Sequence, residues 1–484
     1  MPSVADDGVS GKTAEAVSEE RVQWRRMIVA EVAEALLTGW EQVAPEGGAD
    51  LDDIEQRVQR LLRLAGAVMV HGVAGRAAAE LPRPDCSGCG NPMEVAARRA
   101  REQEGLVGRY RLPRTVYVCR NCGQIAVPAD KDWGVGPGAF SPALSRVVSM
   151  AAAEVPSFAK AAATTGETLG VKLDASTVAL TSEAAGAVAQ ERQAAMVALR
   201  AELEPEAGPP LPPPTAPPTL LISVDATKAN ADKEWRDVKV GVVATLGPER
   251  RSMPDGRICL AVGPHRYVAA IEQTDDFFFR VLSAVREEGW TPGSPLTVLL
   301  IGDGAPFIWN YTPKLEALGI RVHEVVDYYH AAEHVWNVAR QAFTKQGDVH
   351  GWAEPLAAAL RLQGPDPVIA ALDALQPRTK KAREEERKAR AYFTTNAERM
   401  RYPRFAARLW PLGSGIVESS CRVVSGLRVK QPGMRWTFTG VRAILTLRAT
   451  RLSQQRQWAA FWNSKPLLRR PPVSFLRRTE DQVA

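Results

Sequence analysis

The chain lacks several features that would place it in a class at once. Its 484 residues include no apolar run of about 18 residues, which excludes a membrane-spanning helix. The segment 1–20 is acidic, rich in Ala and Ser and without an apolar core, so we expect a disordered tail and not a secretion signal. No Gly-rich loop ending in Lys-Ser or Lys-Thr is present, so we expect no ATP requirement.

Cysteine is scarce, with six in the chain, and four of them form the pairs Cys86-Ser-Gly-Cys89 and Cys119-Arg-Asn-Cys122. Such spacing favours a metal site in a reducing, cytoplasmic compartment over a disulfide framework. A Gly follows each pair and permits the tight turn of a zinc knuckle. The pattern therefore predicts one structural Zn²⁺ held by four thiolates, with two free-thiol pairs as the alternative.

Between the two pairs we expect strands at Arg109–Leu112 and Thr115–Val118, which would complete a zinc ribbon. It is also basic, and its cations are Arg98, Arg99, Arg101, Arg109, Arg111 and Arg114. These side chains form either a DNA-facing surface or a solvated face, and the sequence does not choose between the two.

Helical periodicity dominates the rest of the N-terminal half. Apolar residues recur at helical spacing over Arg21–Val73, which indicates a helical scaffold or a dimerisation arm. Phe140–Ala198 is Ala-rich and also helical, interrupted by Gly170 and by the polar Asp174. That order fits a helix-turn-helix for DNA binding or a plain helical hairpin. The Pro-rich segment 204–219 favours an extended linker and marks a domain boundary.

After the linker the pattern changes to strands. The apolar run Leu220–Val224 predicts a buried strand that ends at Asp225. Further strands are expected at Val238–Leu246, Ile258–Val262, Tyr267–Ile271, Leu296–Ile301 and Arg321–Val326, with helices at Asp275–Glu288 and Pro306–Leu318. This is the element order of the ribonuclease H-like fold, a mixed α/β sheet. Its first strand neighbours the strand after the first helix, which would bring Asp225 and Asp303 together.

The C-terminal part lacks acidic residues almost completely. Between Arg401 and Ala460 there are eleven Arg or Lys and a single acid, Glu418. A stretch of this kind is an electrostatic footprint for a polyanion. The candidate DNA contacts within it are Arg422, Arg428, Lys430, Arg435 and Trp436. The tryptophans of this region either stack on bases or pack in the core, and core packing is the simpler reading for the aromatic residues taken alone.

Glu418 follows Gly413-Ser-Gly-Ile-Val, where the glycines let the backbone approach a neighbour closely. By itself Glu418 is better explained by an ion pair with Arg422, four residues later on the same expected helix face. Together with two aspartates at strand ends it completes a set of three carboxylates suited to a divalent metal. The helical block between Ala331 and Arg408, with a solvated charge cluster at Arg378–Arg390, would then be an insertion.

The residues from Cys86 to Trp462 resemble the DDE transposases of the Mutator-like superfamily, in particular the bacterial insertion-sequence type named after the Kra element. The resemblance is carried by Ser223-Val-Asp-Ala, Trp235-Arg-Asp-Val-Lys-Val-Gly, Gly302-Asp303-Gly-Ala, Asp327-Tyr-Tyr-His-Ala, Gly413-Ser-Gly-Ile-Val-Glu-Ser and Arg428-Val-Lys-Gln-Pro-Gly-Met-Arg-Trp436. It implies that Asp225, Asp303 and Glu418 are the catalytic triad and that Asp327 and His330 are an accessory motif. Ala226 departs from the pattern, because a Gly often follows the first aspartate.

The resemblance implies a transposase that cleaves DNA and transfers strands with Mg²⁺ (or Mn²⁺) at the three carboxylates. His330 would orient the scissile phosphate or the nucleophile, or be a structural histidine. The expected partners are double-stranded DNA at the element ends and the target, and further copies of the chain in a homo-oligomer associated with the nucleoid. The alternatives are a Mg²⁺-dependent nuclease or resolvase without strand transfer, and an inactive zinc-dependent DNA-binding protein.

The predicted organisation is thus a ribonuclease H-like α/β catalytic domain with a helical insertion, preceded by a zinc ribbon and a helical DNA-binding region. The expected boundaries are a tail at 1–20, helices at 21–80, the zinc ribbon at 81–130, the helical region at 131–203, the linker at 204–219, the first part of the catalytic core at 220–330, the insertion at 331–410, the C-terminal catalytic and basic helices at 411–465 and a tail at 466–484.

Overall fold

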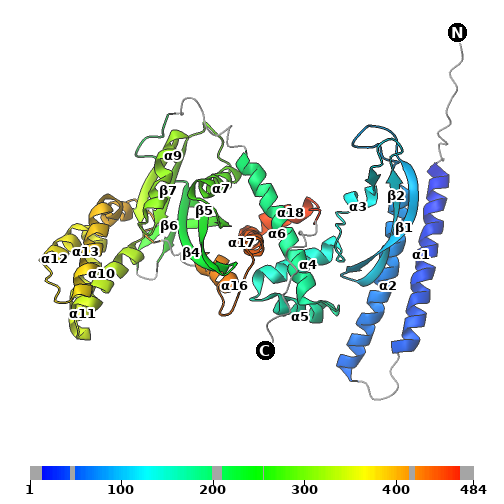
Figure 1. Cartoon of the computed structure of the whole chain (residues 1–484), viewed down its shortest axis with the longest axis horizontal. Coiled ribbons are helices and arrows are strands. Elements are labelled where there is room, and N and C mark those ends of the chain that lie inside the picture. Colours follow the sequence, from blue (N-terminus) through cyan, green and yellow to red (C-terminus); the bar gives the residue numbers. More distant parts are fainter. Residues whose placement is uncertain (1–13, 44–49, 199–209, 254–255, 414–419, 469–484) are drawn as a thin grey trace, which may run out of the picture. The chain divides into compact units, whose positions relative to one another are not determined.

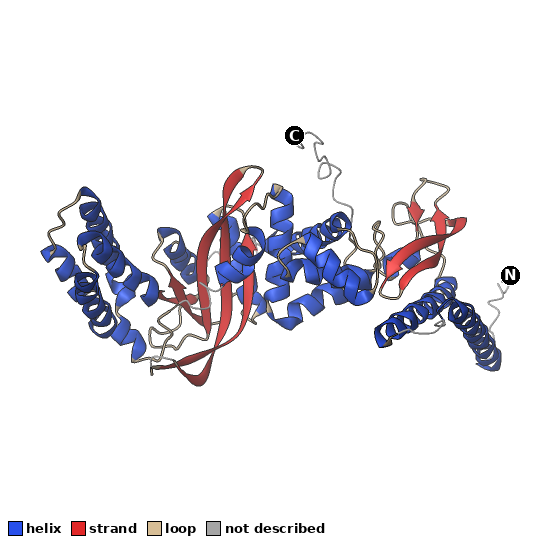
Figure 2. Ribbon diagram, turned by 90° about the horizontal axis from the view of Figure 1, so that it is seen from below, coloured by secondary structure: helices blue, strands red, loops and turns tan. Residues whose placement is uncertain are grey.

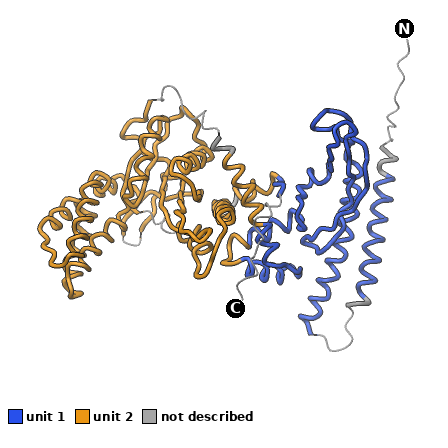
Figure 3. The backbone as a smooth tube through the Cα atoms, viewed as in Figure 1, with its two compact units in different colours: residues 1–151, 158–181, 465–472 blue, residues 152–157, 182–464, 473–484 orange. Residues whose placement is uncertain are grey.

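The computed structural model describes residues 14–43, 50–198, 210–253, 256–413 and 420–468. The chain divides into two compact units (Figure 3). Unit 1 comprises residues 1–151, 158–181 and 465–472, and unit 2 comprises residues 152–157, 182–464 and 473–484. The division between residues 181 and 182 falls inside a helix and not in the Pro-rich segment that the sequence suggested as the boundary.

Unit 1 begins with two long helices, α1 (Ala14–Val43) and α2 (Leu51–Ala79), which contact each other (Figure 1). The Asp50 carboxylate accepts a hydrogen bond from the Asp53 N–H at 2.9 Å and so caps α2. Among the described apolar residues of these helices, Ile28 and Ala65 are buried, and most of the others are exposed or half-buried. The predicted helices are confirmed, whereas their role as a scaffold or an arm stays a prediction.

The middle of unit 1 is an antiparallel sheet of β1 (Glu94–Gly105), β2 (Gly108–Val118) and β3 (Ile125–Ala126), in the order β1-β2-β3. β1 was not predicted, because Ala, Arg and Glu are poor strand formers. Its pairing with β2 from Glu94 to Gly105 overrides that preference. β2 is one strand where two were expected, since Pro113 pairs with Ala100 inside it and β3 reaches only Tyr117 and Val118 on the other side.

Four helices follow the sheet: α3 (Pro128–Asp132), α4 (Pro142–Glu154), α5 (Phe158–Leu169) and α6 (Ala175–Ala198). Gly170 ends α5 with a φ of +59°, a conformation that glycine adopts without strain. Asp174 starts α6 by accepting a hydrogen bond from the Thr177 N–H at 2.8 Å. The predicted sequence of helix, turn and capped helix is confirmed, and its use as a helix-turn-helix is untested.

Unit 2 is built on a mixed five-stranded sheet (Figure 2). Its strands are β4 (Leu220–Ala231), β5 (Glu234–Ser252), β6 (Ile258–Ala270), β7 (Leu296–Gly302) and β8 (Ile320–Val326), in the order β6-β5-β4-β7-β8. β4, β5 and β6 are joined antiparallel, whereas β4, β7 and β8 run parallel. The expected neighbouring of β4 and β7 is therefore confirmed. Helix α7 (Thr274–Glu287) packs on the sheet at Gly241, which leaves room for Phe277 and Val281.

Three element predictions for unit 2 differ from the structure. The strand expected to end at Asp225 continues to Ala231, because residues 226–231 go on pairing with β5. The two short strands expected after residue 258 are the single strand β6, which passes through Gly263 and Pro264. β6 is an edge strand, where a residue without an N–H is tolerated. The single helix expected at Pro306–Leu318 is broken at Asn310 into α8 (Pro306–Trp309) and α9 (Tyr311–Ala317). Pro313 explains the break, since it has no N–H to donate to the Trp309 carbonyl.

The described part of the Pro-rich segment lies against the sheet. The Arg321 guanidinium donates to the Pro212 carbonyl at 2.8 Å, and the Thr219 N–H donates to the Thr297 carbonyl at 3.0 Å. Pro212 and Pro218 are buried. A polyproline segment has no internal hydrogen bonds, so its carbonyls are free to accept such bonds from a neighbour. Residues 210–219 are thus part of the folded unit, and residues 204–209 of the predicted linker lie outside the described part of the chain.

Helices follow β8 and complete unit 2. They are α10 (Tyr328–Ala342), α11 (Gln346–Gln363), α12 (Asp366–Ala374), α13 (Lys380–Thr395), the 3₁₀ turn η2 (Ala397–Met400) and α14 (Tyr402–Ala406). We call these elements the helical layer; α10–α13 group beside the sheet in both views (Figures 1 and 2). α13 exposes most of its charges, as predicted for the charge cluster, and buries Ala389 and Phe393 in the core that it shares with the sheet.

The chain ends in the π-helical turn η3 (Cys421–Gly426), α16 (Leu427–Val429), α17 (Phe438–Leu452) and α18 (Gln454–Asn463). α17 packs on β6, and η3 contacts β4. Taken together, the chain is a mixed α/β protein. Within the described ranges, no helix combines the length and the apolar character that crossing a membrane requires.

Candidate functional site

Three aspartates lie at the same level on the three parallel strands: Asp303 and Asp327 directly follow β7 and β8, and Asp225 lies inside β4, just beyond the point where β4 stops pairing with β7. Ser223 pairs with Ile301, and Ile301 with Val325, so two residues further on the register leads to Asp225, Asp303 and Asp327. The pairing of β4 with β7 stops at Ser223 and Ile301, so the strands part just before Asp225 and Asp303. In open α/β sheets ligands bind outside the carboxyl ends of the strands. This strand edge is the candidate functional site.

Asp225 and Asp303 lie close enough for the negative charge of Asp303 to act on the Asp225 carboxylate. Burial raises the pKa of Asp225, and the negative charge of Asp303 raises it further. The Asp225 carboxylate accepts the Ala226 N–H at 2.6 Å, and the Asp303 carboxylate accepts the Ala305 N–H at 2.8 Å. Both side chains are half-buried. Two repelling carboxylates with free acceptor capacity, at a partly exposed edge, form an arrangement that a divalent cation would stabilise.

The Asp327 carboxylate accepts hydrogen bonds from the backbone. Asp327 is buried, and its carboxylate accepts the N–H groups of Tyr329 at 2.7 Å and His330 at 3.3 Å. Asp327 is thereby the N-cap of α10 and fixes the helix turn that carries His330. His330 lies close enough to Asp225 to lower the pKa of that carboxyl. The predicted accessory pair is thus part of the same edge, with Asp327 in a helix-capping position and His330 toward the carboxylates.

Glu418 lies outside the described residues, within 414–419. The described residues on either side of that range contact the site. Before it, the Tyr328 N–H donates to the Leu412 carbonyl at 2.8 Å, and a Cβ at Gly413 would lie 2.7 Å from the Tyr329 ring. After it, the largely buried thiol of Cys421 hydrogen-bonds the Asp225 carboxylate. Cys421 opens the π-helical turn η3, a type of local winding that is frequent at functional sites.

The basic C-terminal segment is partly internal. Arg428 is 1% exposed; its Nε donates to the Ala152 carbonyl at 2.9 Å, and its guanidinium lies 4.9 Å from the centre of the Trp436 ring. Trp436 is buried and donates to the Val429 carbonyl at 3.2 Å. Burial lowers the pKa of Arg428 to about 10, which leaves it charged at neutral pH. Structural roles therefore replace the predicted DNA contacts at Arg428 and Trp436.

Lys430, Arg422 and Arg435 are exposed, in keeping with the prediction for these three cations. The Lys430 ammonium lies 3.4 Å from the Thr227 hydroxyl on β4, two residues beyond Asp225. Its charge is near enough to Cys421 to lower the pKa of that thiol, although burial raises it overall. An exposed cation beside two carboxylates suits the binding of a phosphate that approaches the strand edge.

These placements predict different effects for neighbouring cations. Arg428→Ala should lower the free energy of unfolding by about 1–3 kcal/mol, because a buried carbonyl loses its donor. Lys430→Ala should leave stability unchanged and weaken DNA binding roughly two- to fivefold, the range of an exposed ion pair. Denaturant unfolding and fluorescence anisotropy with duplex DNA measure the two effects. Equal losses of DNA affinity in the two variants, with unchanged stability, would instead support the predicted DNA contact at Arg428.

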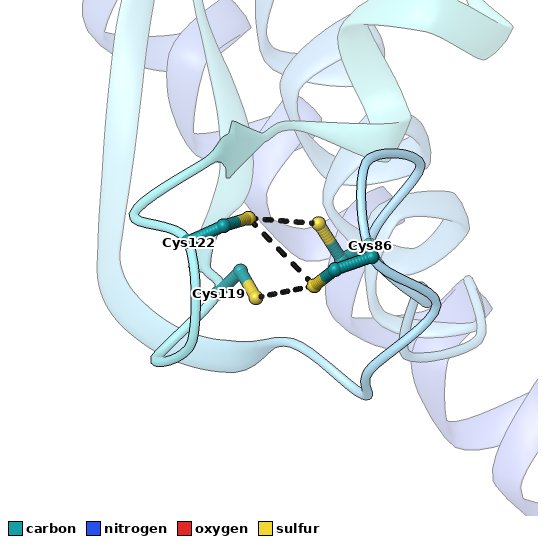
Figure 4. Close-up of side chains that lie close together, drawn as sticks. Cys86, Cys119 and Cys122 are labelled. Atoms are coloured by element: carbon teal, nitrogen blue, oxygen red, sulfur yellow. Dashed lines mark hydrogen bonds between the residues drawn. The ribbon is translucent and has the colours of Figure 1, made fainter.

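A second cluster is formed by the four paired cysteines in unit 1 (Figure 4). All four sulfurs lie within 4.8 Å of one another, and the Sγ of Cys86 is 3.4 Å from that of Cys122. Four thiolates around one tetrahedral zinc stand about 3.8 Å apart for Zn–S bonds of about 2.3 Å. The cysteines are therefore close enough to bind a metal ion such as zinc.

The two cysteine turns have matching backbone geometry. The Gly90 N–H donates to the Cys86 carbonyl at 2.8 Å, and the Gly123 N–H donates to the Cys119 carbonyl at 2.9 Å. Both glycines have a φ near +75°, as expected from the Gly that follows each pair. The backbone N–H of Asn91 is the main cause that lowers the pKa of Cys89 to about 6. In the same cluster a hydrogen bond from the Gln124 backbone lowers the pKa of Cys122, but the sulfurs of the other three cysteines raise it overall, so the four thiols do not share one acidity.

The arginines between the two pairs divide by environment. Arg101 and Arg114 are half-buried and pair with Asp130. Arg109 is exposed and pairs with Glu104 at 3.3 Å. Arg98, Arg99 and Arg111 are exposed. Part of the segment is therefore structural, and the use of the exposed part is untested.

Three residues near the strand edge were not predicted: Cys421, His334 and Tyr392. For Cys421 the sequence offered a signal, because it is three residues after Glu418 and a spacing of three is typical of helices. His334 is four residues after His330, and their rings lie 5.1 Å apart. Tyr392 is 89 residues from Asp303 along the chain. The Tyr392 hydroxyl donates to the Asp303 carbonyl, with 2.8 Å between the two oxygens. No local pattern in the sequence announces a contact over that separation.

Comparison of the chain with models of protein families finds no match, and comparison with curated proteins finds none either.

Proposed function

We propose that the chain is a DDE-type transposase that uses Mg²⁺ (or Mn²⁺) to cleave DNA and to transfer the cut strand to a target. The observation that carries the proposal is the equal level of Asp225, Asp303 and Asp327 on three parallel strands, at the point where the pairing of β4 with β7 stops. The sequence motifs around these aspartates and Glu418 point the same way. A strand edge with repelling carboxylates and a nearby exposed cation is suited to phosphate chemistry.

The sheet supports a ribonuclease H-like fold for the catalytic part. Three antiparallel strands are followed by a helix, and the next strand, β7, adds to β4 in parallel. That order is the one expected of the fold. In this proposal the helical layer after β8 is the insertion, η3 returns the chain to the first strand, β4, and α17 then packs on β6.

Asp225 and Asp303, together with Glu418, would hold the metal. The two described carboxylates fit this role, since each retains acceptor capacity beyond its one backbone hydrogen bond and they repel each other. When bound there, Mg²⁺ activates a water or a terminal 3′-hydroxyl and stabilises the leaving oxygen. The chain's own groups orient the reactants: His330 lies toward Asp225, and Cys421 and Ala226 hold the Asp225 carboxylate by hydrogen bonds.

The other parts of the chain would bind DNA and assemble it. Lys430, Arg422 and Arg435 would contact phosphates near the strand edge. A zinc ribbon built on the four cysteines, with helices α5 and α6 as the reading element, would recognise the element ends. Because two ends must be brought together, the active form would be a homo-oligomer acting on chromosomal DNA in the cytoplasm.

An end-joining assay tests the proposal. Purified protein is incubated with Mg²⁺, a supercoiled target plasmid and DNA fragments that carry the sequence bordering the gene. The expected result is cleavage at the fragment end and joining of its 3′ end to the plasmid, detected by sequencing the junctions. Nicking without joining would indicate a nuclease or resolvase, and binding without cleavage would indicate an inactive DNA-binding protein.

A further inference from the structure

The helical layer reaches the strand edge through Tyr392 of α13. Its hydroxyl donates to the Asp303 carbonyl at 2.8 Å. Burial raises the pKa of Tyr392, so the hydroxyl keeps the proton that it donates. The His334 ring stacks on the Tyr392 ring with centroids 4.1 Å apart, and the His330 ring meets it edge-on at 6.4 Å. Tyr392 is therefore enclosed by residues of α10 and fixed in direction.

The turn that follows Asp303 is shaped around this tyrosine. Gly304 has a φ of +98°, and a Cβ at that position would lie 2.5 Å from Cε2 of Tyr392. The Asp303 carboxylate accepts the Ala305 N–H at 2.8 Å, so the side chain is bound to the same turn whose carbonyl Tyr392 holds. A glycine in this turn has wide conformational freedom, and the orientation of Asp303 depends on the contacts that restrict it.

Tyr392 is the first of three anchors between the helical layer and the strand ends. Arg399 pairs with Glu324 of β8 at 2.5 Å, and the Tyr402 hydroxyl donates to the Val326 carbonyl at 3.1 Å. The segment from Tyr392 to Tyr402 thus crosses the carboxyl ends of β7 and β8 at three successive points. These three contacts hold the segment 392–402 in place next to Asp303.

We propose that Tyr392 is a positioning residue, which holds the Asp303–Ala305 turn so that the Asp303 carboxylate faces Asp225. The helical layer then helps to position a residue of the candidate site, in addition to packing against the sheet. This inference rests on the proposed function for its chemical consequence, whereas the positioning itself depends only on the contacts around Asp303. No role of this kind follows from the motif residues alone, because Tyr392 belongs to none of them.

Tyr392→Phe tests the hydroxyl alone, because it keeps the ring against His334 and Gly304. The matched control is Tyr311→Phe, which removes a hydroxyl that donates from α9 to the Thr274 carbonyl of α7 at 3.5 Å, outside the motif residues. Hydrogen exchange at the Ala305 amide reports the turn directly. We expect faster exchange in Tyr392→Phe than in the wild type and the control. We also expect a roughly 10- to 100-fold loss of kcat for Mg²⁺-dependent cleavage, with KM for DNA unchanged, as for residues that orient a metal ligand.

Equal exchange at Ala305 in wild type, Tyr392→Phe and Tyr311→Phe would overturn the inference. Faster exchange together with unchanged kcat would also overturn it, since the turn would then not govern Asp303. If the wild type cleaves no DNA while Ala305 still exchanges faster in Tyr392→Phe, the positioning holds and the proposed function is what fails. Circular dichroism and thermal unfolding of each variant confirm that it folds before the comparison is made.

Discussion

Asp303→Asn is expected to abolish Mg²⁺-dependent DNA cleavage while leaving DNA binding intact. The amide has nearly the shape of the carboxylate, so its oxygen can still accept the Ala305 N–H and the turn is preserved. The change removes one negative charge from the pair with Asp225, so that a divalent cation loses a ligand charge. The loss of rate should exceed the roughly 10- to 100-fold typical of a residue that merely supports a metal ligand.

Asp373→Asn is the matched control, because Asp373 lies on α12, is exposed and pairs with Arg390 at 3.2 Å within the helical layer, outside the motif residues. It should cleave at the wild-type rate. The measurements are the single-turnover rate of plasmid cleavage and the dissociation constant for duplex DNA. An Asp303→Asn protein that cuts normally would remove the strand edge as the catalytic site, whatever reaction the wild type performs.

Cys119→Ser is expected to have the largest effect on folding. Cys119 is 1% exposed and its sulfur lies 3.5 Å from that of Cys89, so its loss opens the cluster. A structural zinc contributes apparent binding free energy of about 10–16 kcal/mol in small zinc modules. That exceeds the net stability of many domains, about 5–15 kcal/mol, so the β1-β2-β3 sheet should lose its fold without the metal. A strong chelator should have the same effect on the wild type.

Cys259→Ser serves as the control, since Cys259 lies on β6 and outside the four-cysteine cluster. Zinc content by elemental analysis should be one per chain in the wild type and in Cys259→Ser, and near zero in Cys119→Ser. Hydrogen exchange should show loss of protection over residues 94–126 in the Cys119 variant. Retention of one zinc and of that protection would show that the four sulfurs do not form the metal site.

The sequence predicts those parts of the fold that rest on local pattern. β4 was recognisable because Leu220–Val224 is an apolar run interrupted only by Ser223, and the neighbouring of β4 and β7 followed from the element order. β1 was not predicted, because it forms a strand through its pairing with β2 and not through its own composition. Only part of the prediction for the Pro-rich segment was right, because its hydrogen-bond partners lie about 80 to 110 residues away along the chain: the Arg321 guanidinium, which donates to it, and the Thr297 carbonyl, which accepts from it.

The candidate site shows the same division. Asp225 and Asp303 could be paired from sequence, since each ends a predicted strand. Tyr392 could not, because helices of unknown packing separate it from Asp303. Arg428 was misread for a physical reason: a cation in a basic stretch is normally solvated, and only the tertiary structure shows that the Ala152 carbonyl and the Trp436 ring receive it.

The burial of arginine also changes how strongly salt should weaken DNA binding. Of the eleven cations between Arg401 and Ala460, Arg428 and Arg448 are buried, and Arg448 donates to the carbonyls of Ala153, Val423 and Val424. Such side chains displace no condensed counterions from a duplex, because they never reach its phosphates. At most nine of the eleven remain for that exchange. The ionic-strength dependence of this segment should therefore be shallower than its composition suggests.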